Sequence, residues 1–121
     1  MKHSSSNISV HQKIFQMQCE ICKSLGHPIR LQIVDRLNKG EASASCLIAA
    51  LEISKGSLSK HMSLLQHGGI VEARREGRQI IYRLTDPEIY KACAIMRSIL
   101  YRRLIQGEKL ALAIKSAKVN Q

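Results

Sequence analysis

Three of the four cysteines have a spacing that could support thiol chemistry. Cys19 and Cys22 lie one helical turn apart, and Cys93 lies in a later helical segment. Three thiolates suit a pyramidal soft ion such as arsenite, and a pair with a resolving thiol suits reversible oxidation. A single Cys-x-x-Cys is also compatible with inert packing, because free cysteine is one of the most buried residue types. Inert packing, sensing of an oxidant or sulfur species, and soft-metal binding therefore all stay open.

A second group of residues, between positions 53 and 83, concentrates positive charge and serine hydroxyls. On a helix capped by Ser54, the side opposite the apolar residues carries Lys55, Ser57, Ser59 and Lys60. Small hydroxyl side chains permit close approach to a DNA major groove, and cations bind phosphates and guanine edges. The plainer alternative is a solvated polar face. The basic residues of this region are Lys55, Lys60, Arg74, Arg75, Arg78 and Arg83, and Glu72 and Glu76 oppose them.

Three arginines surround a predicted tight turn at residues 76–78. Gly77 supplies the positive φ that such a turn needs, so the flanking segments are predicted to form a β-hairpin. Arg74, Arg75 and Arg78 near the tip could reach phosphates or a minor groove. Charge on an edge strand also prevents unwanted pairing between sheets, and the two roles are compatible.

Helical periodicity before this hairpin predicts four helices. The last two are short and joined by a tight turn, so together with the basic hairpin they predict a winged helix-turn-helix. His61 lies at the border of the buried side and is predicted to be a packed or capping histidine. The predicted helices run from Val10 to Leu25, from Pro28 to about Asn38, from the caps Ser43 and Ser45 to Leu51, and from Ser54 to Gly68, with Leu58, Met62 and Leu65 buried on the last.

A further helix is predicted after the hairpin, with Asp86 as its cap and Pro87 at its first position. It carries an apolar stripe, and the first helix has an unusually wide apolar arc. Burying both across a two-fold axis predicts a homodimer through the first and last helices. The predicted organisation is a flexible arm over 1–8, a winged helix-turn-helix domain over 9–106, and a basic tail over 107–121 that is helical or frayed.

Composition limits the classes of function. The chain has 121 residues with 19 Lys and Arg against 9 Asp and Glu, a formal net charge of +10, which favours a polyanionic partner. No apolar run approaches the roughly 20 residues that span a bilayer, and the apolar faces are spread over five helices as a packed core requires. The start of the chain lacks a secretory signal, so a cytoplasmic protein with reduced thiols is expected. No catalytic triad, carboxylate pair or phosphate loop predicts an enzyme.

Four motifs in order give the sequence a family resemblance: Leu25–Val34, the run Ile53–Leu65, Gly69-Ile70-Val71 with Arg74–Arg78, and Tyr82-Arg83-Leu84. They resemble the ArsR family of small transcriptional regulators, and the resemblance spans about residues 15 to 105. It implies a winged-helix homodimer that represses its own operon and releases DNA when an inducer binds. Its DNA-facing positions correspond to Lys55, Ser57, Ser59 and Lys60, with Arg78 in the wing.

The sequence departs from the sensing sites of that family. Metal sensors of the family begin the third helix with Cys-Val-Cys-Asp, where this chain has Ser43-Ala44-Ser45-Cys46. A serine hydroxyl stays protonated near neutral pH and is a poor ligand for a thiophilic metal. The last helix has Glu88 but no histidine, and Asp35 stands where some relatives have a redox cysteine on the second helix. No resident metal or cofactor is therefore predicted.

The sequence predicts a repressor that binds an inverted-repeat operator in double-stranded DNA as a homodimer. A thiol-reactive inducer (an oxidant, a sulfur species or arsenite) acting at Cys19, Cys22 and Cys93 is the candidate release signal. The alternatives are a regulator with inert cysteines and no small-molecule sensing, and a protein-interaction module on the same fold. The predicted DNA contacts are Ser54, Lys55, Ser57, Ser59, Lys60, Arg74, Arg75 and Arg78.

Overall fold

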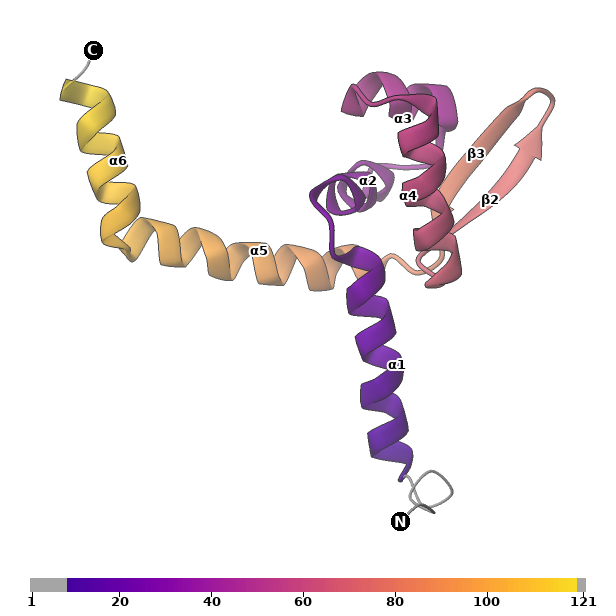
Figure 1. The fold of residues 1–121 in the computed structure, drawn as a ribbon, viewed down its shortest axis with the longest axis horizontal. Helices are drawn as coiled ribbons and strands as arrows, with labels where there is room; N and C mark the ends of the chain where they lie inside the picture. Colours follow the sequence, from indigo (N-terminus) through magenta and orange to yellow (C-terminus); the bar gives the residue numbers. More distant parts are fainter. Residues whose placement is uncertain (1–8, 120–121) are drawn as a thin grey trace. The chain divides into compact units, whose positions relative to one another are not determined.

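The computed structural model describes residues 9–119 (Figure 1). The chain forms two compact units, of which the first ends at Pro87 and the second begins at Glu88. The predicted flexible arm, residues 1–8, lies outside the described residues. None of the described helices combines the length and the apolar character that crossing a membrane requires. The first unit contains α1 (Val10–Leu25), α2 (Pro28–Asn38), β1 (Ala42–Ser43), α3 (Ala44–Leu51), α4 (Lys55–His67), β2 (Val71–Glu76) and β3 (Gln79–Leu84), and the second contains α5 (Glu88–Gln106) and α6 (Glu108–Val119).

The core of the first unit lies where α2, α3 and α4 pack on one another and on the sheet. It is built almost entirely from aliphatic side chains, as a sequence with one Phe, three Tyr and no Trp requires, and Tyr82 is the one of these that is buried in the described part of the chain. The predicted buried side of α4 is confirmed. The core side chains are Ile33, Val34, Leu37, Ala42, Leu47, Leu58, Met62, Leu65, Ile70, Val71 and Tyr82.

The helix ends follow the capping residues that the sequence offers. Ser9 forms a capping box with Gln12 at the start of α1, and Ser43 and Ser54 accept backbone N–H groups as the N-caps of α3 and α4. His27 caps α2 with Pro28 at its first position, because its Nδ1 accepts the N–H of Ile29 at 3.0 Å. The predicted limits of α1 and α2 and the caps Ser43 and Ser54 are thus confirmed, whereas Ser45, the other predicted cap of α3, lies inside that helix.

A three-stranded antiparallel sheet has the order β1-β3-β2. The hairpin of β2 and β3 turns at Gly77, whose φ of 63° confirms the predicted turn, and its tip projects away from the helices of this unit (Figure 1). Strand β1, in which Ala42 and Ser43 pair with Tyr82 and Ile81, was not predicted. Two residues are too few to show an alternating pattern, so this strand carries no local signal.

The second unit is built from α5 and α6. Helix α5 begins at Glu88 rather than at the predicted Pro87, which lies in the turn before it. This prediction was wrong by one residue, a difference within the usual spread of helix ends. Most of the large apolar side chains of α5 are exposed, and α6 occupies the segment predicted as a basic tail.

Candidate nucleic-acid interface

Helices α3 and α4 form the helix-turn-helix that positions the candidate interface. Between them, Glu52 is the C-cap of α3 with φ 54° and ψ 48°, the one left-handed non-glycine residue in the described part of the chain. This conformation reverses the backbone within a few residues. Ser54 then begins α4 by accepting the backbone N–H of Ser57 at 3.0 Å. The side chain of Ser54, a predicted DNA contact, is therefore engaged in capping.

The outer side of α4 presents the predicted lysines and serines to solvent. Lys55, Ser59 and Lys60 are exposed, and Ser57 is half-buried. On the opposite side of the helix, Leu58, Met62 and Leu65 are buried in the core. Their packing fixes the rotation of α4 about its axis and so keeps the polar side toward solvent. The structure thus places all four residues on the solvent-accessible part of one helix.

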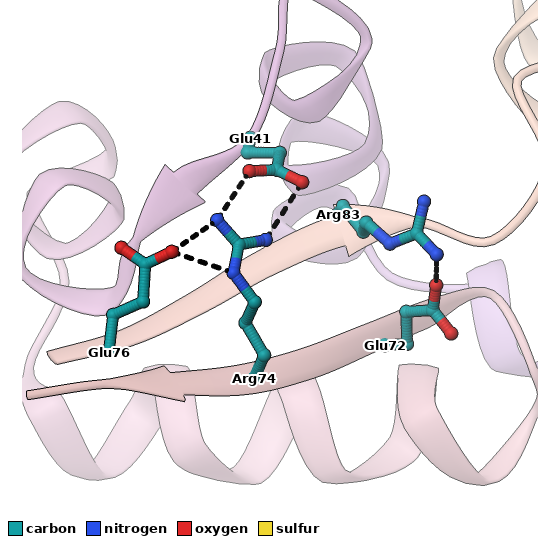
Figure 2. Close-up of polar contacts among 5 residues, drawn as sticks. All are labelled: Glu41, Glu72, Arg74, Glu76 and Arg83. Carbon is teal, nitrogen blue, oxygen red and sulfur yellow. Dashed lines mark hydrogen bonds and ion pairs between the residues drawn. The ribbon is translucent and has the colours of Figure 1, made fainter.

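The wing contains an ion-pair cluster that the sequence did not predict. Arg74 on β2 forms a bidentate pair with Glu41, with 2.8 Å from Nη1 to Oε2 and 2.8 Å from Nη2 to Oε1. The same guanidinium contacts Oε2 of Glu76 at 2.9 Å through Nε and at 2.7 Å through Nη2 (Figure 2). We call Glu41, Arg74 and Glu76 the wing clamp. Because Glu41 is distant from Arg74 in the sequence, no local pattern predicts this pair.

The pairing of Arg74 with Glu41 shifts the pKa values of these two residues in opposite directions. The hydrogen bond from Arg74 lowers the pKa of Glu41 below its ordinary value of 4.5, more than partial burial raises it. The hydrogen bonds to Glu41 and Glu76 raise the pKa of Arg74. Glu41 and Arg74 are therefore both ionised at neutral pH, and the carboxylate offsets the positive charge of Arg74 locally.

A second ion pair holds Arg83, and the other basic residues between positions 53 and 83, apart from Arg74, are unpaired in the described part of the chain. Arg83 on β3 pairs with Glu72 on β2 across the hairpin (Figure 2). Within residues 9–119, by contrast, Lys55, Lys60, Arg75 and Arg78 make no ion pair, and all four are exposed. We call these four residues the unpaired cations. Two belong to α4 and two to the wing, so four of the six cations between positions 53 and 83 are left to meet a polyanion.

Behind α4, a buried histidine connects this helix to α2. His61 is 8% exposed, which confirms it as a packed histidine. Its Nδ1 lies 3.1 Å from Nη1 of Arg30, and its ring centroid lies 4.4 Å from that of His27. Because a guanidinium only donates, this Nδ1 accepts and carries no proton. Burial first, and then the nearby His27, Arg30 and Lys60, lower the pKa of His61 below 6.5.

The candidate thiols lie on both units. Cys19 and Cys22 are exposed on α1, whereas Cys93 is half-buried on α5. Cys46 is exposed on α3, where Nη2 of Arg36 lies 3.6 Å from its Sγ. All four cysteines belong to the described residues, and none of them forms a disulfide there.

The comparisons with known proteins agree with this geometry. A helix-turn-helix domain family matches residues 25–74, which contain α2, α3 and α4. The HTH-type transcriptional regulator Rv0081 of Mycobacterium tuberculosis is 30% identical over 94 residues, which cover 77% of this chain and 82% of that protein. The biofilm growth-associated repressor of Xylella fastidiosa is 42% identical over 91 residues, covering 75% and 76%.

Solved structures decide the family. The homodimeric winged helix-turn-helix DNA-binding domain of Mb0332 from Mycobacterium bovis, a possible ArsR-family regulator, has a TM-score of 0.73 at 26% identity, covering 84% of this chain and 94% of that one. The chain belongs to the ArsR family of transcriptional regulators. As an ArsR-family regulator it has the fold of DNA-binding proteins rather than of enzymes. The transcriptional repressor BigR from Xylella fastidiosa has a TM-score of 0.66 at 31% identity, covering 82% and 96%.

Proposed function

We propose that this ArsR-family regulator represses transcription by binding an inverted-repeat operator as a homodimer, with α4 in the major groove and the wing on the flanking backbone. The observation that supports this most directly is the location of the four unpaired cations on α4 and the wing. Every acidic residue of the hairpin is paired with Arg74 or Arg83, so little negative charge faces an approaching phosphate.

The two elements have different parts in the proposal. Helix α4 has 13 residues and is therefore about 20 Å long. An α-helix is narrow enough to enter the major groove, and this length lets several of its side chains reach the DNA. Ser57, Ser59 and Lys60 are the proposed readers of base edges, and Lys55 contacts a phosphate near the helix start. Arg75 and Arg78 at the hairpin tip contact phosphates or enter a minor groove.

Dimerisation is supported by the apolar side chains that each unit leaves in solvent. On α1, Phe15 is 68% and Ile14 55% exposed, and on α5, Met96 is 66% and Leu100 51% exposed. Apolar surface of this extent favours burial against another protein surface. Mb0332 is homodimeric, and we propose that α1 and α5 form the corresponding interface here. Sedimentation at micromolar concentration tests this, and a stable monomer contradicts it.

Release by a thiol-reactive inducer is the second part of the proposal. Cys19 and Cys22 are accessible on α1, one of the two proposed interface helices. Arsenite or an oxidant acting on them together with Cys93 would change the interface and so the spacing of the two α4 helices. The alternative is that the cysteines are inert. Operator binding measured before and after treatment with arsenite or an oxidant distinguishes the two.

The deciding experiment measures binding to duplex DNA selected from a random pool, as a function of salt. Each phosphate neutralised by an unpaired cation lowers the log–log slope by about 0.9, so a dimer is expected to show a slope of several units. The quadruple variant Lys55→Gln, Lys60→Gln, Arg75→Gln, Arg78→Gln removes that dependence. A flat salt response of the unmodified protein contradicts the proposal.

A further inference from the structure

A cavity lies beside the proposed DNA-binding surface, between α4 and the wing. Its volume is about 360 Å³, and its walls come from the starts of α3, α4 and β3. Ile48, Leu58 and Ile80 supply apolar lining, and Lys55 and Arg78 supply positive charge. The volume falls within the range of small-molecule sites, at its lower end.

The charges around this cavity favour an anion. None of the residues lining it in the described part of the chain is acidic, and its two cations are unpaired cations. Beside apolar side chains the local dielectric is lower than in water, so a carboxylate or sulfonate pairs there more strongly than on open surface. Ser59 adds a hydroxyl to the same walls.

The apolar lining selects among anions. An inorganic phosphate or a nucleic-acid backbone would satisfy the cations but leave the accessible surface of Ile48 and Ile80 in water. A ligand with an apolar body covers these side chains, and each buried CH₂ contributes about 0.8 kcal/mol. We infer that the cavity binds a small amphipathic organic anion, with the anionic group at Lys55 and Arg78 and the body against Ile48, Leu58 and Ile80.

Binding of such an anion opposes DNA binding. The ligand pairs with Lys55 and Arg78, two of the four unpaired cations, and so withdraws them from the operator phosphates; ligand and operator therefore compete. This consequence rests on the proposed function. It gives the regulator a chemical input that is independent of its cysteines.

The test uses octanoate as the probe and follows backbone amide signals of the full chain by NMR. Octanoate is expected to shift the amides of Ser45, Ile48 and Ile80, whereas acetate and 1-octanol are not. The apparent Kd for duplex DNA is expected to rise linearly with octanoate concentration. It is expected to rise at least tenfold when octanoate is well above its own Kd for the cavity. Octanoate shifts confined to α1 or α5, or an equal effect of 1-octanol, overturn the inference.

Two variants locate the effect. Ile48→Trp fills the cavity and is expected to abolish the octanoate response while DNA binding persists, and Ala49→Trp, exposed on the same helix, keeps the response. Ile80→Asp, at a strand position 37% exposed, places a repelling carboxylate there and also abolishes octanoate binding if Ile48→Trp does not fold. If octanoate binds at the cavity and the affinity for DNA is unchanged, the inference that ligand and operator compete is wrong. Octanoate binding in a chain that binds no DNA contradicts the proposed function but supports the site.

Discussion

The guanidinium of Arg74 and the carboxylate of Glu41 face each other in a bidentate pair, 2.8 Å apart at both contacts, although 33 positions separate the two residues. The pair joins the wing to the segment between α2 and α3. Within the described residues, Arg74 is the one predicted DNA-contacting cation that pairs with acidic residues of its own chain. The wing clamp therefore sets how much charge the wing offers to DNA.

Removing the carboxylates of the wing clamp is expected to strengthen DNA binding. The double variant Glu41→Gln, Glu76→Gln leaves Arg74 able to bind a phosphate, which raises affinity and steepens the salt slope by about 0.9 for each additional phosphate neutralised. Fluorescence anisotropy at several salt concentrations measures both. Glu20→Gln with Glu52→Gln removes as many acidic charges without touching the clamp, and an equal rise in affinity in this control would show that only net charge matters.

The clamp also has a pH dependence with a definite sign. Because the pKa of Glu41 is lowered in the folded chain, its contribution to stability is present above the unfolded value of 4.5 and is lost as pH falls through the folded pKa. We expect an NMR titration of the Glu41 carboxyl to have its midpoint below 4.5. Arg74→Gln moves that midpoint upward, and an unchanged midpoint would mean that Arg74 does not cause the shift.

Helix α4 and the wing tip are expected to differ in what they read. Lys60→Ala or Ser57→Ala weakens binding to a selected operator by about 1–3 kcal/mol while random DNA is less affected, if a base contact is lost. Arg78→Ala weakens both DNAs evenly, as a phosphate contact does. Competition binding on the two DNAs measures the difference, and equal losses for all three variants leave no base-reading role for α4.

The lowered pKa of His61 leads us to expect a loss of folding stability in mild acid. The folded chain keeps this imidazole neutral, so the unfolded chain binds more protons below about pH 6.5 and the free energy of unfolding falls there as pH is lowered. Urea unfolding at pH 5.5 and 7.5 measures this. His61→Gln is expected to flatten the dependence, whereas His67→Gln, exposed on the same helix, does not. An unchanged dependence in His61→Gln would assign the acid sensitivity to another group.

The close approach of α1 and α4 depends on Gly68. A Cβ at this position would overlap the side chain of Ser24, so Gly68→Ala is expected to destabilise the fold by about 1–3 kcal/mol. Gly56→Ala, in the first turns of α4 with open space around it, is the matched control and stabilises by about 0.5–1 kcal/mol. Urea midpoints compare the two, and equal effects would contradict the role of Ser24.

The thiols are tested by operator binding before and after arsenite or an oxidant. If Cys19 or Cys22 acts with Cys93, the unmodified chain loses affinity and Cys93→Ser does not respond. Cys46→Ser reports on the exposed thiol of α3, where modification could hinder DNA binding by crowding. Identical responses of the unmodified chain and Cys93→Ser would make Cys93 a packing residue.

Local patterns in the sequence were sufficient for most elements of the fold. Serine caps, the glycine of the hairpin turn and the apolar spacing of α4 act within a few residues, and the structure confirms each. Strand β1 was missed because its pairing with β3 crosses about half the first unit. The clamp was missed for the same reason, so the sequence suggested six cations for DNA where the structure leaves four unpaired.

The pairing of β1 with β3 has a consequence for the order of folding. The β2–β3 hairpin closes through a two-residue turn and is expected to form in microseconds, whereas Ala42 and Tyr82 meet only by closing a loop that contains α3 and α4. The hairpin therefore forms early but acquires its orientation late, once both helices have collapsed into place. A nascent chain released before residue 82 would lack most of β3, the strand against which β1 docks and on which α2 and α3 pack.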